Sequence, residues 1–121
     1  MTVGRLGIGR LGERAAVAYL QSRGYRILAT NWRTRFGEID VVAEQGGTLV
    51  FVEVRTRRTG GFGTAAESVD GRKQRQLVLM AQQYLQRHAP TAPARIDVIT
   101  VSASPRAPAA VEHFIGAVSA D

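Results

Sequence analysis

The sequence predicts a single α/β domain in which a sheet is packed between helices. Two segments repeat apolar residues with a helical period and five carry short strand-like patterns, in the order helix, three strands, helix, two strands. This order is typical of an α/β sandwich and differs from a strict βαβ repeat. The chain has 121 residues, 45% of them hydrophobic and 21% charged, which fits one ordinary globular domain over residues 1–121.

The first third of the chain predicts a helix and a strand after a glycine-containing lead-in at residues 1–8. The helix is expected over about 9–23, with two apolar stripes that suggest cover on more than one side. Gly24 is a natural C-terminal stop. Residues 25–32 follow as a strand.

Residues 36–56 predict a β-hairpin. Gly46-Gly47 suits a two-residue turn because both central positions can take a positive φ. Closing the hairpin there pairs Ala43 with Val50, which places Ile39, Val41 and Ala43 on one apolar face with three valines opposite. The same register pairs two sets of charged residues, namely Asp40 with Glu53 and Glu38 with Arg55.

The second half of the chain predicts a helix and two strands. The helix is ended by Pro90 and Pro93, and its apolar face carries Leu77, Met80, Ala81, Tyr84 and Leu85. The expected elements are a glycine-rich basic loop at 57–63, the helix at about 68–88, a strand at 95–101, a loop at 102–110 and a weaker strand at 111–118.

Composition excludes several kinds of function. The chain has no cysteine, which removes disulfides, thiolate catalysis and cysteine-based zinc sites. We expect a cytoplasmic protein without a membrane partner, because no apolar run approaches the roughly 20 residues that span a bilayer and no signal-peptide core is evident. The net charge of +6 favours polyanions, above all nucleic acid, as partners, although a basic surface can also serve solubility alone.

Asp40 and Glu53 are the strongest functional signal. Two carboxylates directly opposite each other in a hairpin destabilise it unless they share a proton or hold a cation. Oxygen-only ligands suit Mg²⁺ or Mn²⁺. Alternatively, one acid pairs with Arg55 or Arg57 while the other faces solvent.

The sequence leaves two possible roles open for each of three further charged residues. Glu13 heads an apolar stripe of the first helix, so it either faces a cleft or complements the helix dipole. Glu38 extends the acidic cluster or, as we favour, forms a salt bridge with Arg55. Arg55 supplies a fixed charge beside a phosphate or balances nearby acids, but it cannot act as a base.

A basic rim and three other residues complete the candidates. The rim either binds phosphates or is a solvated helix start. Trp32 and Phe62 are expected to pack rather than stack on bases, and Asp97 is expected to be the buried partner of an arginine. The rim consists of Arg57, Arg58, Arg72, Lys73 and Arg75.

Several short motifs follow one another over about residues 7–101. They are Gly12-Glu13, Gly24-Tyr25, Asn31-Trp32-Arg33, Gly37-Glu38-Ile39-Asp40, Phe51-Val52-Glu53-Val54-Arg55-Thr56-Arg57, Lys73 and Arg95-Ile96-Asp97-Val98. As a set, these motifs resemble the YraN family of small bacterial proteins. The resemblance implies a restriction-endonuclease-like three-layer sandwich of the PD-(D/E)XK superfamily, with a central mixed sheet of about five strands flanked by helices, similar to archaeal Holliday-junction resolvases.

The resemblance also implies roles for individual residues. Asp40 and Glu53 match the metal-binding acids of the superfamily, and Glu13 matches the helix acid of resolvase-like members. Arg55 stands where the superfamily motif has a lysine that orients or helps activate water. Lys73, the sole lysine, is then a candidate to supply that group from the second helix, and otherwise activity is weak or lost.

These observations lead us to expect a Mg²⁺- or Mn²⁺-dependent nuclease acting on DNA, in particular branched or single-stranded DNA. Its catalytic residues would be Asp40, Glu53, Glu13, Arg55 and Lys73, the first three as metal ligands. The alternatives are a non-catalytic nucleic-acid-binding module with a degenerate site and a protein-interaction scaffold. A homodimer would suit a two-fold junction.

Overall fold

The computed structural model describes residues 5–58, 69–88, 91–104 and 107–119. Five strands form one sheet in the order β1-β2-β3-β4-β5, in which β3 and β4 are parallel and the other neighbours are antiparallel. The predicted α/β class and mixed five-stranded sheet are confirmed. The elements are α1 (Arg5–Ser22), β1 (Arg26–Thr34), β2 (Gly37–Gln45), β3 (Thr48–Arg58), α2 (Gly71–His88), β4 (Ala94–Ser104) and β5 (Ala107–Val118).

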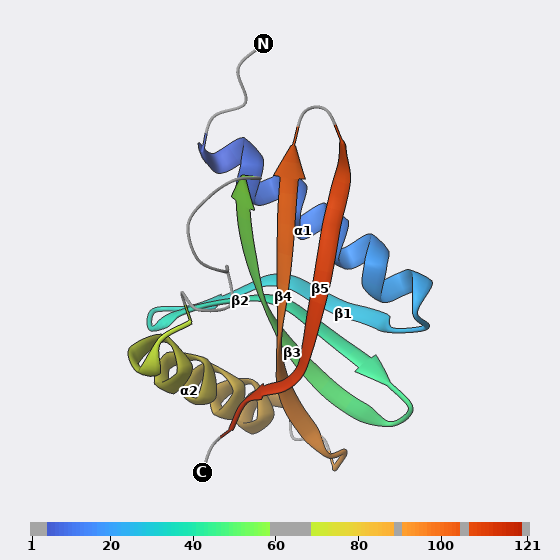
Figure 1. Ribbon diagram of the computed structural model, residues 1–121. Helices are drawn as coiled ribbons and strands as arrows, with labels where there is room; N and C mark the ends of the chain where they lie inside the picture. Colours follow the sequence, from blue (N-terminus) through green and yellow to red (C-terminus); the bar gives the residue numbers. More distant parts are fainter. Residues whose placement is uncertain (1–4, 59–68, 89–90, 105–106, 120–121) are drawn as a thin grey trace.

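The two helices pack on opposite faces of the sheet, which gives three layers (Figure 1). On one face, Leu77, Met80 and Tyr84 of α2 join the apolar cluster around Phe51. On the other face, Ala16 and Leu20 of α1 join a cluster of strand residues. Burying apolar side chains on both faces provides the main driving force for this arrangement.

Helix α1 begins before the predicted start and is buried along one stripe. Ala16 and Leu20 are fully buried, whereas Leu11 is 48% exposed and Ala18 is also exposed. The expectation of cover on more than one side is therefore wrong for the start of the helix. Since α1 lies on a single sheet face, only the residues that meet the sheet are covered.

The predicted hairpin turn is confirmed. Gly46 and Gly47 have φ values of 57° and 83°, the positive values that a tight primed turn requires. The ladder pairs Ala43 with Val50, as expected, and continues to the pair Val41 and Val52.

Strands β4 and β5 are longer than the sequence indicates. The predicted loop at 102–110 is wrong, because the two strands pair as far as Ser104 and Ala107. The Ser, Pro and Ala content suggested a linker, yet backbone pairing with a neighbouring strand extends both strands. Strand β3 likewise continues through Arg58 into the predicted basic loop, most of which lies outside the described residues.

Neither helix described in the structure is long and apolar enough to cross a membrane.

Candidate active site

The β2 and β3 strands separate at Asp40, and this divergence opens the site. Their ladder ends at Val41 and Val52, so the predicted ladder pairs of Asp40 with Glu53 and of Glu38 with Arg55 are wrong. Instead, the Asp40 Oδ2 accepts a hydrogen bond of 2.8 Å from the backbone N–H of Val54. The Asp40 carboxylate thus provides an acceptor for a backbone N–H of β3 at the point where the β2–β3 backbone pairing stops.

A change of face in β2 accompanies this divergence. Ile39 packs in the α2-side cluster, whereas Val41 packs in the α1-side cluster, so the predicted single apolar face is wrong for Ile39. The β1–β2 register places Asn31 of β1 beside Asp40, and Asn31 has a φ of 52°. Asparagine is among the few residues that tolerate this left-handed conformation. The left-handed backbone at Asn31 thus lies beside the point where β2 changes face.

Glu53 is a buried carboxylate between two cations. Its residue is only 4% exposed, and its Oε2 lies 3.2 Å from Arg55 Nη2 and 3.2 Å from Lys73 Nζ. The pairing with Arg55 is one of the predicted alternatives, and Lys73 does reach the acid from α2. A buried carboxylate is costly without compensating charges, and these two cations lie close enough to provide them.

Asp40 has a strongly perturbed acidity. The pKa of Asp40 is raised from 3.8 to about 8, chiefly by burial and then by the charge of Glu53, a hydrogen bond with Glu53 and the charge of Glu13. The hydrogen bond from Val54 acts in the opposite direction. At neutral pH without a cation, Asp40 is therefore protonated.

A close helix–strand approach positions Glu13. A Cβ added to Gly12 would lie 1.8 Å from Thr56 Oγ1, so α1 and β3 can meet this closely only at a glycine. This close contact places the next residue, Glu13, near the end of the β2–β3 ladder. The prediction that Glu13 faces a cleft is confirmed, because Glu13 lines the same cleft as Asp40.

Glu13, Glu38 and Asp40 form a compact acidic group in which one oxygen from each residue lies within 4.8 Å of the others. The site therefore includes Glu38, for which the sequence favours a salt bridge. Glu38 does form such a bridge, but with Arg33 at 2.9 Å and not with Arg55.

Asn31 is a site residue that the sequence did not indicate as functional. In the amide orientation that satisfies its neighbours, its nitrogen donates to Glu38 Oε1 at 2.5 Å and to Glu13 Oε2 at 3.2 Å. The backbone distortion at Asn31 thus links acids from α1 and β2. Its only sequence signal is its place in the Asn31-Trp32-Arg33 motif.

These residues line one cleft of about 590 Å³. It contains four acids and four basic residues, so charges of both signs meet in it. Arg10 and Arg33 were not predicted for the site. The lining residues are Gly9, Arg10, Glu13, Asn31, Arg33, Glu38, Asp40, Glu53, Val54, Arg55 and Lys73.

The predicted basic rim divides into three parts. Lys73 lies inside the cleft, whereas Arg72 and Arg75 are exposed near the start of α2. Arg57 is half-buried on β3. The side chain of Arg58 and the whole of Phe62 lie outside the described residues.

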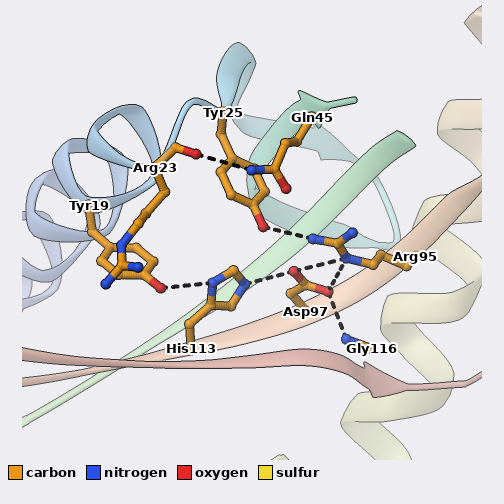
Figure 2. Close-up of polar contacts among 8 residues, drawn as sticks. All are labelled: Tyr19, Arg23, Tyr25, Gln45, Arg95, Asp97, His113 and Gly116. Atoms are coloured by element: carbon orange, nitrogen blue, oxygen red, sulfur yellow. Dashed lines mark hydrogen bonds and ion pairs between the residues drawn. The ribbon is translucent and has the colours of Figure 1, made fainter. Parts of the chain in front are cut away.

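Asp97 belongs to a separate polar cluster on the α1 side of the sheet (Figure 2). As expected, it is fully buried and pairs with an arginine, with Arg95 Nε 3.0 Å from its Oδ1. His113 Nε2 lies 2.7 Å from the other carboxylate oxygen, and Gly116 N–H donates at 2.9 Å. Tyr19 of α1 contacts the opposite nitrogen of His113, so the cluster connects α1 to β4 and β5. None of its residues lines the cleft.

Trp32 packs as expected. It meets Tyr84 edge-on, with ring centroids 5.2 Å apart, and lies against the α2-side core.

The sequence of this chain is similar to that of many bacterial proteins of one family. The uncharacterised protein family UPF0102 matches residues 12–101, which include every acid of the cleft. A UPF0102 protein of Mycolicibacterium vanbaalenii is 47% identical over 116 residues, covering 95% of this chain and 96% of the relative. A UPF0102 protein of Symbiobacterium thermophilum is 48% identical over 99 residues, covering 81% and 84% of the two chains. The chain belongs to the UPF0102 (YraN) family.

Proposed function

We propose that this protein is a metal-dependent nuclease that hydrolyses phosphodiester bonds of DNA. The observation that carries the proposal is the convergence of four carboxylates from α1, β2 and β3 in one cleft, within a chain of net charge +6. Gathering acids in this way destabilises the empty site, as the raised pKa of Asp40 indicates. Such perturbed groups in a cleft are characteristic of functional sites.

The donor set fits a hard divalent cation. Glu13, Glu38 and Asp40 offer oxygen atoms close enough to share one ion, and Glu53 is hydrogen-bonded to Asp40. Carboxylate oxygens are the ligands that Mg²⁺ and Mn²⁺ prefer. A bound ion of this kind polarises a phosphodiester and lowers the pKa of water.

The basic residues of the cleft suit a phosphate. Arg55 Nε is buried without a hydrogen-bond acceptor among the described residues, and a phosphate oxygen would satisfy it. Lys73 Nζ, held by Glu53, supplies a second positive charge beside the acids. Together they would stabilise the negative charge that develops during phosphodiester cleavage.

The alternative is a nucleic-acid-binding module whose chemistry has been lost. One observation favours it: Glu53 is already neutralised by Arg55 and Lys73, which limits its availability as a metal ligand. The module would bind DNA in a salt-dependent and metal-independent manner.

The test is cleavage of labelled branched, single-stranded and duplex DNA with Mn²⁺ or Mg²⁺, comparing wild type with Asp40→Ala. The nuclease predicts metal-dependent cleavage that the substitution abolishes. Glu112→Ala, which removes an exposed acid of β5, is the control and should cleave normally. Absence of cleavage by pure wild type on every substrate would refute the nuclease, and retained salt-dependent binding would support the module.

A further inference from the structure

A groove along α1 adjoins the cleft. It has a volume of about 390 Å³ and lies between α1 and β1, which is an edge strand of the sheet. Four residues line both the cleft and this α1–β1 groove, namely Arg10, Glu13, Asn31 and Asp40. The two hollows therefore meet at acids that are proposed to hold the cation. The remaining residues of the groove are Arg14, Val17, Ala18, Gln21, Thr30 and Val41.

The α1–β1 groove is open to solvent along its length. Six of the residues that line it are exposed, including Asn31 at the junction with the cleft, so no buried segment separates the two hollows. From Arg10 to Gln21 the helix rises roughly 16 Å. One nucleotide occupies about 3.4 Å along a strand of B-DNA, so the groove can hold more than one nucleotide. The exposed residues are Arg10, Arg14, Ala18, Gln21, Thr30 and Asn31.

Arg10 and Arg14 give the groove its positive charge. Among the described residues, neither has an ion pair or an aromatic contact, whereas Arg33 and Arg55 of the cleft pair with acids. Arg10 and Arg14 are four residues apart on one side of α1, where like charges repel. A phosphate bound between them would remove this repulsion, and the planar guanidinium group is well suited to phosphate.

The chemistry of the groove suits a sugar-phosphate backbone. Among the described residues that line it, none is aromatic, so the groove offers no aromatic ring on which a base could stack. Gln21 and Thr30 add hydrogen-bonding groups of the kind that contact phosphate and sugar. Such contacts fix the path of a strand without reading its sequence.

We propose that the α1–β1 groove is a subsite for the backbone of a nucleic acid strand that extends out of the cleft, with Arg10 and Arg14 binding phosphates next to the one that is cut. This inference rests on the proposed nuclease function and adds the path of the strand to it. The sequence did not indicate these two arginines, because exposed arginines on a helix are usually solvated.

The test measures how the affinity for fluorescent oligothymidylate depends on salt, in a buffer without divalent cations so that the strand is not cut. Arg14→Gln should reduce the slope of log affinity against log salt concentration by about 0.7, the contribution of one phosphate contact with a single strand. The reduction should be the same for a sugar-phosphate strand of equal length that lacks bases. Arg75→Gln removes an exposed arginine from α2, on the other face of the sheet, and is the matched control that should leave the slope unchanged.

A second pair of variants adds charge instead of removing it. Ala18 is exposed in the groove one helical turn after Arg14. Ala18→Lys should therefore steepen the slope by about 0.7. Gln86→Lys adds the same charge at an exposed position of α2 and should not change the slope.

The outcomes separate this inference from the proposed function. An unchanged slope for Arg14→Gln, or equal reductions for Arg14→Gln and Arg75→Gln, would overturn the subsite even if metal-dependent cleavage is observed. A reduction confined to the strand with bases would overturn recognition of the backbone. The expected slopes without cleavage of any DNA would refute the nuclease and leave the groove as a nucleic-acid-binding site. If wild type binds neither strand and cleaves no DNA, both proposals fail.

Discussion

Asp40 determines the chemistry of the site because its half-buried carboxyl group lies next to three other acids. Its neutral form is stabilised by burial and by Glu53, and a divalent cation would replace the proton as the compensating charge. Proton and metal therefore compete for the same oxygen atoms. This competition gives the site a measurable dependence on pH.

We expect Asp40 to make the protein less stable as the pH rises. The pKa of Asp40 is 3.8 in the unfolded reference and about 8 in the folded protein. Between these values the folded state binds more protons than the unfolded state, so the free energy of unfolding falls as pH increases and levels off above about pH 8. Asp40→Asn removes the ionisable group and with it this pH-dependent loss of stability. The substitution should therefore raise the free energy of unfolding by at least about 1 kcal/mol near pH 8 and change it little near pH 4. Urea unfolding at both pH values measures the difference.

Glu112→Gln is the control for this prediction, because it removes an exposed acid with the same change in charge. An identical pH dependence for wild type and Asp40→Asn would show that Asp40 is not the group responsible.

Lys73 is the second residue whose role can be isolated. Because Lys73 Nζ lies 3.2 Å from Glu53 inside the cleft, the proposed nuclease function predicts that Lys73→Gln lowers the cleavage rate by roughly 100-fold while DNA affinity falls only slightly. Arg87→Gln removes a charge from the other end of α2 and should leave the rate unchanged. Steady-state kinetics at a fixed salt concentration distinguish the two. Equal rates for Lys73→Gln and wild type would exclude Lys73 from catalysis.

At the scale of elements, the contact between α1 and β3 controls the position of Glu13. Gly12→Ala would place a methyl group against Thr56, so α1 must move outward. We expect a loss of about 1–3 kcal/mol in stability and weaker binding of Mn²⁺, since Glu13 moves with the helix. Thermal unfolding and calorimetric titration with Mn²⁺ measure the two effects.

Gly9→Ala provides the matched control on the same helix, at a position that also lines the cleft but supplies no side chain to it. A Cβ at Gly9 meets nothing within 4 Å, so the substitution should stabilise α1 by roughly 0.5–1 kcal/mol through helix propensity. Metal affinity that is the same in Gly12→Ala and Gly9→Ala would contradict the positioning role of the α1–β3 contact.

Local patterns were sufficient to predict several elements and insufficient for others. The glycine pair specified the turn and the register near it, because φ requirements and alternation act over a few residues. The divergence at Asp40 could not be predicted, because the alternation of β2 runs through Asp40 in the sequence and nothing local marks where the ladder with β3 ends. The lengths of β4 and β5 depend on pairing between segments that composition marked as a loop.

At the scale of the whole molecule, the acids and bases are unevenly distributed. The chain has 16 basic and 10 acidic residues, yet four of the acids line one cleft. The sequence identified Asp40, Glu53, Glu13, Arg55 and Lys73 as site residues, and the fold brings all five into that cleft. It did not identify Asn31, Arg10, Arg33 or the part that Glu38 plays, because these contacts form only when α1, β1 and β2 are packed together.

Anomalous diffraction from crystals soaked in Mn²⁺ would show whether this cleft holds a divalent cation. We expect a Mn²⁺ peak at about 2.1 Å from an Asp40 oxygen, with Glu13 or Glu38 as a further ligand, and its loss in Asp40→Asn crystals. No peak in the cleft at saturating Mn²⁺ near pH 8, where Asp40 ionises, would contradict this expectation.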